Sequence, residues 1–349
     1  SPKEAAALLD SYLVIPRDSL EKQNAWYRWV DHFDPITRRP NPDSFPRLGP
    51  LDSEETCALL LYAAKWPNGF RCPRCGHAHA LRINTRRLPL FQCARCRHQA
   101  SLTAGTLFEK SRTPLTKWFL ALYWFAACGI NAVALQSLIG VTYKTAWLML
   151  AKIRYAVHFR DAQTLLSGWV RIMPSDYGTL TSARRFEDRR FRPQLYPLIV
   201  GASLHPDGRP QALKIKLVPE AELPGRSYHS LEGADIRAQR WFAAQHVEAR
   251  GSHVQFFDSY YARAHLLAGI GYRTKPHITR IYRGIGFKHL QAYIDERAFR
   301  LLAHQDADVP PDRQLLNICA ASSPIPYASI IRINGLSHCM DTDMSRSIA

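Results

Sequence analysis

Two Cys-x-x-Cys pairs separated by seventeen residues constrain the fold of this chain more than any other feature. The first pair is Cys72 and Cys75, and the second is Cys93 and Cys96. Two such pairs can bring four thiolates to the corners of a tetrahedron, which is the geometry of a structural zinc site. The alternative, free or disulfide-bonded cysteines, is disfavoured by the spacing. Because four thiolates leave no open coordination position, we expect Zn²⁺ to hold the segment together without taking part in catalysis.

The segment between the two pairs is short, strand-like and rich in arginine over residues 81–91. Together with the cysteines, this pattern predicts a zinc ribbon over about residues 66–103. A helix is expected before the ribbon, because Ser53 is a favourable N-cap and two glutamates follow it in the first turn.

Positive charge is concentrated around the cysteines. The 349-residue chain has 46 Lys+Arg and 29 Asp+Glu, a net charge of +17, and residues 67–160 contain fourteen Lys/Arg and one acid, Glu109. Such a basic block is typical of phosphate binding, whereas general solubility, the alternative explanation, needs no clustering. We therefore expect a nucleic acid as a partner, with these candidate phosphate contacts: Arg74, Arg86, Arg87, Arg95 and Arg97. The helix-turn-helix pattern of residues 131–154 makes double-stranded DNA the expected form of that partner.

Residues 131–154 predict a helix, a glycine turn at Gly140, and a second helix with Thr142 as its N-cap. This pattern is typical of a helix-turn-helix, whose second helix enters the major groove; a purely structural three-helix bundle is the alternative. We expect Ala146, Leu150 and Ile153 to face inward. The candidate DNA contacts on the second helix are Lys144 and Thr145, early in the helix and nearest to base edges, and Lys152 and Arg154.

The C-terminal half changes to a strand-rich pattern. Strands are expected at residues 168–173, 195–204, 211–218 and 253–257, and helices near 234–247, 262–268 and 287–302. This order is compatible with a ribonuclease-H-like α/β domain. The expected fold class is multidomain, α+β and α/β. Its parts are an N-terminal helical extension with a proline-rich linker (1–50), a helix plus zinc ribbon (51–105), a helix-turn-helix (106–165), a ribonuclease-H-like domain (166–305) and a tail without a readable pattern (306–349).

Three further features concern the cellular compartment. The other four cysteines are scattered, and we find no secretory signal peptide, which together favour a reducing compartment. The longest apolar run, residues 118–130, is too short to span a bilayer. We therefore expect a cytoplasmic, nucleoid-associated protein with no membrane partner.

Several segments of the chain resemble bacterial insertion-sequence transposases of the DDE type with an N-terminal zinc ribbon, the group related to Merlin elements. The resemblance covers about residues 45–302 and rests on residues 66–76, 91–99, 103–108, 113–118, 144–154 and 288–300. It implies a ribbon and helix-turn-helix that bind transposon ends. It also implies a ribonuclease-H-like domain that cuts and joins DNA with two Mg²⁺ or Mn²⁺ ions held by acidic side chains.

The chain departs from this family at the first catalytic aspartate, whose position at the end of the first strand is occupied by Met173. A thioether is a poor ligand for Mg²⁺, which prefers oxygen. Arg171 replaces a family glutamate in the same motif. Asp176, three residues later, would serve as a ligand only if the end of the strand were rebuilt.

The second and third catalytic positions match unequally. Asp258 follows the last expected strand and is the best candidate for the second aspartate, although a strict count places Phe257 there. The segment expected to supply the third ligand, residues 277–287, contains no acid, and Glu296 lies on the following helix. Lys288 and His289 match a family motif and are expected near the nucleic acid, with helix packing as the alternative role for His289.

These observations leave three hypotheses. The first is a DNA-binding protein of transposase descent whose nuclease centre is inactive. The second is an active transposase that uses Asp176, Asp258 and a third acid, Glu296 or Glu187, with Mg²⁺ or Mn²⁺. The third is a scaffold whose zinc ribbon contacts other proteins. By analogy with transposases, we expect a homodimer or a larger nucleoprotein assembly.

Overall fold

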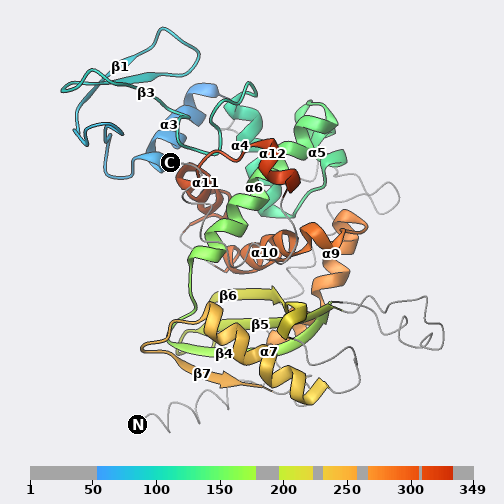
Figure 1. Ribbon diagram of the computed structural model, residues 1–349. Coiled ribbons are helices and arrows are strands. Elements are labelled where there is room, and N and C mark those ends of the chain that lie inside the picture. Colours follow the sequence, from blue (N-terminus) through green and yellow to red (C-terminus); the bar gives the residue numbers. More distant parts are fainter. Residues whose placement is uncertain (1–52, 178–195, 223–230, 258–265, 306–308, 333–349) are drawn as a thin grey trace. The chain divides into compact units, whose positions relative to one another are not determined.

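The computed structural model describes residues 53–177, 196–222, 231–257, 266–305 and 309–332 (Figure 1). Their elements form two compact units. The first unit contains residues 53–160 together with 303–332, and the second contains residues 161–302. The chain is therefore a mixed α/β multidomain protein, as its sequence predicts.

The first unit begins with helix α3, Glu54–Lys65, followed by the three short strands of a ribbon. Strands β1 (Ala80–Ile83), β2 (Leu90–Cys93) and β3 (Gln99–Ser101) form an antiparallel sheet in that order. An aromatic cluster joins α3 to this sheet. The ring centroids of Trp66 and Phe91 are 5.3 Å apart, and those of Trp66 and Phe70 are 5.1 Å apart.

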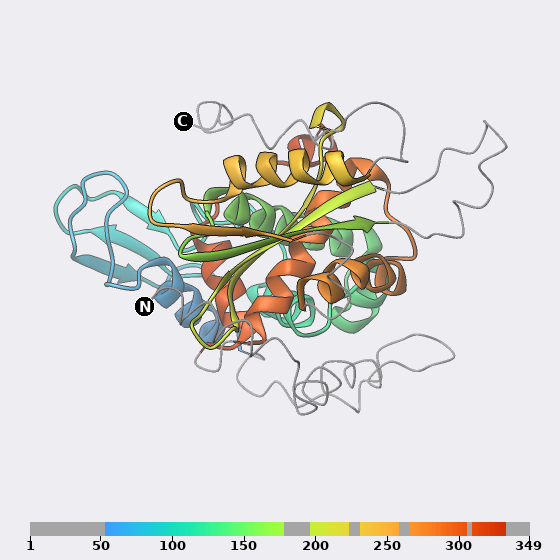
Figure 2. The ribbon, with the colours of Figure 1, turned by 90° about the horizontal axis from the view of Figure 1, so that it is seen from below.

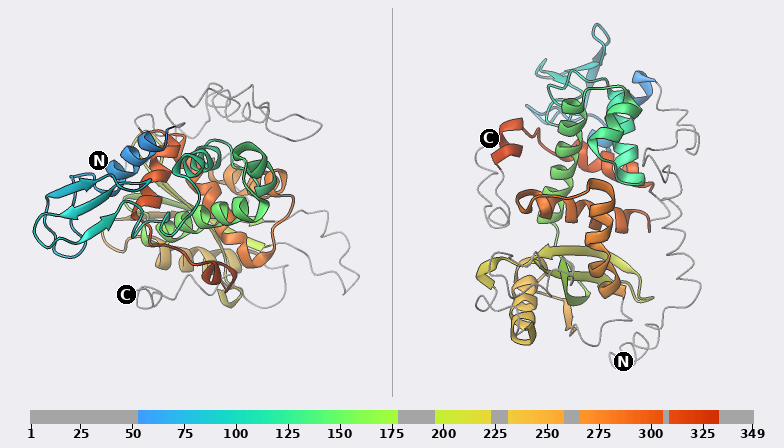
Figure 3. Two further views of the ribbon diagram at one scale, coloured as in Figure 1. Left: turned by 90° about the horizontal axis from the view of Figure 1, so that it is seen from above. Right: turned by 90° about the vertical axis from the view of Figure 1, so that its right-hand side faces the viewer.

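Five helices complete the first unit: α4 (Leu115–Ala127), α5 (Ala132–Ile139), most of α6 (Tyr143–Gln163), α11 (Pro311–Ala321) and α12 (Tyr327–Arg332) (Figure 3). Helix α4 is buried on most sides, and α11 packs against both α3 and α4. The backbone N–H of Leu107 donates to the carbonyl of Cys319, 3.0 Å away, so the C-terminal segment is an integral part of this unit.

The second unit contains a four-stranded sheet in the order β6-β5-β4-β7. Strands β4 (Trp169–Tyr177), β5 (Tyr196–Leu204) and β6 (Pro210–Leu217) are antiparallel neighbours, and β7 (His253–Phe256) is parallel to β4. A one-turn 3₁₀ helix, Glu220–Glu222, follows β6.

Helices cover both faces of this sheet (Figure 2). Helix α7, Leu231–His246, packs on one face through Ala238 and Phe242. The other face is covered by α8 (Leu266–Tyr272), α9 (Thr274–Tyr282) and α10 (Phe287–Ala303). Gly201 of β5 permits the close approach of α7, because a Cβ atom at this position would lie 2.4 Å from the Phe242 ring.

Helix α10 also supplies hydrogen-bond partners to the backbone of β6, the outer strand of the sheet. The side-chain amide of Gln291 donates to the carbonyl of Ile215, 2.9 Å away, and its oxygen accepts from the N–H of Leu217 at 2.8 Å. Next to this edge, the buried ammonium of Lys216 lies 2.7 Å from the carboxylate of Asp295. These contacts give buried polar groups the partners that they need away from water.

The strand expected at residues 168–173 is longer in the structure, because β4 continues to Tyr177. The sequence predicts that the strand ends before Pro174, since proline cannot donate a hydrogen bond to a neighbouring strand. The carbonyl of Ile172 accepts from Phe257 on the β7 side. The nitrogen of Pro174 faces the same side, where β7 has already ended at Phe256, and so no hydrogen bond is lost.

Helix α9, which contains Pro276 in its first turn, is not among the helices expected from the sequence, and α11 and α12 lie in the tail for which no pattern is predicted. In the part of the chain that the structure describes, no helix has both the length and the apolar character needed to cross a bilayer.

Glu54 is expected to stabilise the first unit as a long-range helix cap. Its carboxylate oxygens accept from the backbone N–H groups of Leu115 (3.1 Å) and Thr116 (3.2 Å), at the start of α4, where Pro114 supplies no side-chain cap. Glu54→Ala should lower the free energy of unfolding by about 1–2 kcal/mol, because two orphan donors lose a charged acceptor. Thermal denaturation followed by circular dichroism measures this change. Glu55→Ala, at an exposed neighbour, is the control and should have little effect.

Candidate metal centre and nucleic-acid interface

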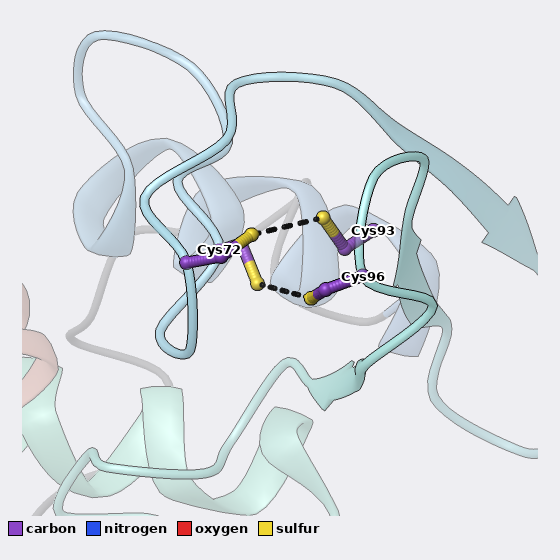
Figure 4. A group of neighbouring side chains, drawn as sticks. Cys72, Cys93 and Cys96 are labelled. Carbon is purple, nitrogen blue, oxygen red and sulfur yellow. Dashed lines mark hydrogen bonds between the residues drawn. The ribbon is translucent and has the colours of Figure 1, made fainter.

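The four cysteines of the ribbon form one compact cluster (Figure 4). All four Sγ atoms lie within 4.8 Å of one another, and the closest pairs, Cys72 with Cys96 and Cys75 with Cys93, are each 3.6 Å apart. A tetrahedral zinc ion with Zn–S bonds of about 2.3 Å needs S···S separations of about 3.8 Å. The donor set and its spacing therefore fit a structural Zn²⁺ ion.

The two Cys-x-x-Cys turns have the same backbone geometry. In each turn, the residue after the second cysteine donates its N–H to the carbonyl of the first: Gly76 to Cys72 at 2.9 Å and Arg97 to Cys93 at 3.0 Å. Both donors are left-handed, with φ values of 70° for Gly76 and 56° for Arg97. Glycine adopts this conformation without steric cost, whereas arginine does not.

Backbone groups in the second turn favour the thiolate form of Cys93. Hydrogen bonding from the backbone of Cys96, assisted by that of Arg95, lowers the pKa of the Cys93 thiol to about 6, although desolvation opposes the shift. The thiolate is the zinc-binding form. Cys75 shifts the opposite way: a backbone hydrogen bond from His77 favours its thiolate, but hydrogen bonds with the other cysteines and desolvation together raise its pKa to about 12.

Four of the five arginines proposed as phosphate contacts are exposed in the ribbon: Arg74, Arg95 and Arg97 in the two cysteine turns and Arg86 in the loop between β1 and β2. Arg87 is half-exposed and forms an ion pair with Glu54, so part of its charge is neutralised within the protein. Arg74, Arg95 and Arg97 are next to zinc ligands in sequence. The cysteine cluster thus gathers three cations from two separate turns into one region.

The expected helix, glycine turn and helix are formed by α5 and α6. The side chain of Asn131 caps α5 by accepting from Ala134 N–H at 2.9 Å, and α5 ends at Gly140, which is left-handed with φ 61° and ψ 54°. The Oγ1 atom of Thr142 accepts from Thr145 N–H at 3.2 Å and caps α6, as predicted.

The first turn of α6 presents Lys144 to solvent, and Thr145 is half-buried with its hydroxyl 3.0 Å from that of Thr142. The inward-facing side of the helix is confirmed, since the three apolar residues expected there are buried: Ala146, Leu150 and Ile153. Lys152 is half-buried, and desolvation lowers its pKa.

Arg154 requires a correction, because it does not face outward. Its side chain is 4% exposed, and its guanidinium lies 5.8 Å from the centre of the Phe125 ring in α4. Arg154 follows Leu150 by four residues, and this spacing, which places it on the same buried face, was the signal available in the sequence. In this arrangement its charge contributes to packing between helices and is not exposed to a phosphate.

Met173 and Asp176 project from opposite faces of β4. Met173 is fully buried in the core formed with α8–α10. Asp176 stands three residues further along a regular strand, paired with Pro197, and therefore points to the α7 face. Asp176 is exposed, although desolvation by surrounding atoms raises the pKa of its carboxyl group. The strand end is not rebuilt, and Asp176 does not occupy the place of Met173.

Glu296 is buried in α10 and already has two partners. The Tyr282 hydroxyl donates to its carboxylate, and the Arg300 guanidinium lies 3.5 Å away. The structure does not bring Asp176 and Glu296 into one metal-binding group. Among the described residues, the four cysteines are the one cluster of three or more potential metal ligands. Asp258 and Glu187 lie outside the described residues.

The end of β7, just before Asp258, adjoins apolar and cationic side chains. Phe257 packs against the core that contains Met173. The buried guanidinium of Arg171 lies 5.4 Å from the centre of the Phe257 ring, and its Nε donates to Gln255 Oε1 at 3.2 Å. In the same unit, Lys288 is exposed and His289 is half-buried at the start of α10.

Comparison with known proteins relates the ribbon to transposases. Residues 52–99 match the family model described as "Transposase zinc-ribbon domain". A 96-residue segment is 34% identical to "Uncharacterized protein in transposable element ISH50" from Halobacterium salinarum. This match covers 27% of the chain and 33% of the relative, so the chain spans about a third of the length of that relative. No solved structure matches the chain significantly.

At Arg97, the effect of the backbone conformation on stability and the effect of the side-chain charge on DNA binding can be measured with one substitution, because the residue has a positive φ. Arg97→Gly should leave the zinc-loaded ribbon equally stable or stabilise it by up to about 1 kcal/mol, because glycine relieves the positive φ. The same variant should weaken binding to DNA and reduce the dependence of log K on log salt by about one contact. Zinc content, thermal denaturation and fluorescence anisotropy at several salt concentrations measure these effects.

Gly76→Ala is the matched variant in the other turn. A Cβ atom there meets nothing within 4 Å, so the change tests backbone strain alone. It should destabilise the ribbon by about 1 kcal/mol without changing the salt dependence. Equal DNA affinity and salt dependence in Arg97→Gly and the wild type would show that Arg97 does not contact phosphate.

Proposed function

We propose that this chain is a DNA-binding protein related to insertion-sequence transposases, and that it binds duplex DNA through its zinc ribbon and the α5–α6 helix pair. The observation that carries this proposal is the four-cysteine cluster, within a segment that matches a transposase zinc-ribbon domain and carries exposed arginines beside its ligands. A rigid, metal-closed turn fixes the backbone that carries these arginines, so that binding to phosphates needs to order only their side chains.

The α5–α6 pair is proposed as a helix-turn-helix with α6 as its recognition helix. Support comes from the tight left-handed turn at Gly140 and from the cap at Thr142, which together fix where α6 begins. In this motif, residues at the N-terminal end of the second helix reach base edges. Lys144 and Thr145 occupy that end, which makes them the proposed base contacts, while the ribbon arginines position the DNA backbone.

The second unit is proposed to be ribonuclease-H-like. Three antiparallel strands followed by a helix and a fourth strand parallel to the first support this assignment. In the related transposases that the sequence resembles, acidic side chains at the first and fourth of these strands hold two metal ions. The corresponding places here are next to each other, because β4 and β7 are paired from Trp169–His253 to Ile172–Phe256.

We propose that this nuclease centre is inactive. The side chains at the adjoining strand positions are Met173 and Phe257, which are apolar, and Arg171 adds a positive charge that opposes cation binding. Mg²⁺ requires oxygen ligands, usually including carboxylates. An active transposase would need Asp258 to meet two other carboxylates, and neither Asp176 nor Glu296 is favourably placed for this role.

The remaining parts of the proposal follow from the same relationship. Assembly into a homodimer or larger nucleoprotein complex is proposed by analogy with transposases. A ribbon that serves as a protein scaffold is the competing function. Phosphate contacts release counterions, so binding through them weakens as salt rises. A scaffold would show little or no DNA binding, or binding that does not depend on salt.

Base recognition by α6 predicts a specificity change in Lys144→Ala. This variant should cost about 1–3 kcal/mol on the preferred site and discriminate less against other sequences, because a base contact is lost. A duplex selected from a random pool by the wild-type chain, with a shuffled duplex, provides the two probes for anisotropy titrations. Arg160→Ala, at the other end of α6, is the control and should bind both duplexes as the wild type does. A uniform loss on both duplexes would make Lys144 a phosphate contact.

An inactive centre predicts that the zinc-loaded chain neither cleaves nor joins its selected duplex in Mg²⁺ or Mn²⁺. Asp258→Ala should then leave DNA affinity unchanged, because no metal is lost. Labelled substrates resolved on denaturing gels measure both strand cleavage and strand transfer. Metal-dependent transfer by the wild type that is abolished in Asp258→Ala would establish the active alternative.

A further inference from the structure

We propose that α9 and the turn leading into α10 form a second surface that binds the phosphates of duplex DNA. This α9 basic surface comprises the exposed arginines Arg273, Arg280 and Arg283. It belongs to the second unit, whereas the function proposed above places DNA on the ribbon and on the α5–α6 pair of the first unit. A chain with two such surfaces would hold two segments of DNA.

The first argument is the local charge. Residues 266–305 contain seven Lys/Arg and two acids, Asp295 and Glu296. Both acids are buried, and Asp295 is bound to Lys216 while Glu296 is bound to Tyr282 and Arg300. No exposed carboxylate therefore lies among residues 266–305, and the charge that reaches solvent from this stretch is positive.

The second argument is the geometry of α9. Thr274 and Ile278 are fully buried, which fixes the inward side of the helix. Arg273 and Arg280 are seven residues apart, almost two turns, so they project from the same outward side. Arg283 continues this row at the end of the helix. All three arginines are exposed, and Tyr272, beside Arg273, is 77% exposed.

The third argument is the layer beneath α9, which adds fixed positive charge. Arg297 donates to the hydroxyl of Thr274 at 3.2 Å, and a guanidinium nitrogen of Arg300 lies 2.8 Å from the ring of His277. Both arginines are buried. Burial first, and then the charges of Arg300, Arg297 and Arg280, lower the pKa of His277. Part of this positive charge is balanced within the layer by Glu296, whose carboxylate lies 3.5 Å from Arg300.

Duplex DNA fits this surface better than an anionic membrane does. Arg273 and Arg283 flank the nine residues of α9, and ten steps of about 1.5 Å place them about 15 Å apart along its axis. Over the same length of duplex axis, one DNA strand presents about four phosphates. A helix that binds lipid exposes its apolar side to the bilayer. In α9 the apolar residue Ile278 is turned into the core and the arginines remain outside, so the surface offers charge without insertion.

The test compares two double variants of the full, zinc-loaded chain that change its net charge by the same amount. Arg280→Gln with Arg283→Gln removes two proposed contacts. Arg240→Gln with Arg250→Gln, also at exposed arginines of the second unit, makes the same change in net charge and serves as the control. The probe is a 20-base-pair duplex of random sequence, titrated at several salt concentrations. DNA bound per protomer is measured by sedimentation.

We expect the wild type and the control to bind two duplexes per protomer at low salt, and the α9 variant to bind one. In the wild type and the control, the second binding step should weaken as salt rises, with a slope in log K against log salt of about 0.9 for each phosphate contact. Equal stoichiometry and equal salt dependence in both double variants would overturn the proposal. So would an α9 variant that loses binding to phosphatidylserine vesicles but keeps both duplexes.

Lys144→Ala separates this inference from the proposed function. If the α6 site is wrong but the α9 surface is right, Lys144→Ala will bind DNA as the wild type does, while the α9 variant still loses one duplex. If the α9 surface is wrong and the first site is right, Lys144→Ala will weaken binding to the selected duplex and the α9 variant will not.

Discussion

A cluster of four cysteines whose spacing fits one Zn²⁺ ion is the constraint on which the ribbon of the first unit depends. The ribbon strands are only three or four residues long, and the cluster of Trp66, Phe70 and Phe91 is a small core. Such a module gains much of its folding free energy from metal binding. Without Zn²⁺, the cysteine cluster would place four thiols within 4.8 Å of one another with no ligand to hold them. The positions of the flanking arginines are therefore as stable as the metal site.

Hydrogen bonds and an ion pair connect the ribbon to the neighbouring helices α3 and α4. The ammonium of Lys65, at the end of α3, donates to the carbonyls of Ser101 and Leu102 at 3.0 and 3.1 Å, immediately after the ribbon sheet. Glu54, at the start of the same helix, accepts from the first N–H groups of α4 and pairs with Arg87 of the ribbon. Helix α3 is thus fixed at both ends, and the ribbon is not an isolated appendage of the helical unit.

Local signals in the sequence predicted part of this structure, and contacts between distant segments determined the rest. The cysteine spacing, the Ser53 cap, the Gly140 turn and the four strands of the sheet depend on a few adjacent residues, and all are present. The end of β4 depends on where β7 stops, and α11 is stabilised by α3 and α4, nearly two hundred residues or more earlier. The end of β4 has no local signature, whereas α11 carries two helix-start signals, Pro311 at its first position and Asp312 in its first turn. For the candidate site, the sequence located the zinc ligands, but it assigned Arg154 to solvent because charge outweighed periodicity in that prediction.

The most direct test of the account is the salt dependence of duplex binding by the chain with and without zinc. Zinc-loaded protein should bind a duplex with log K falling steeply as log salt rises, because several arginines and lysines replace counterions. After removal of zinc by a chelator, both the affinity and the steepness should decrease, since the ribbon arginines lose their fixed positions. Equal affinity and equal steepness in the two states would show that the zinc ribbon does not bind the DNA and would contradict the account.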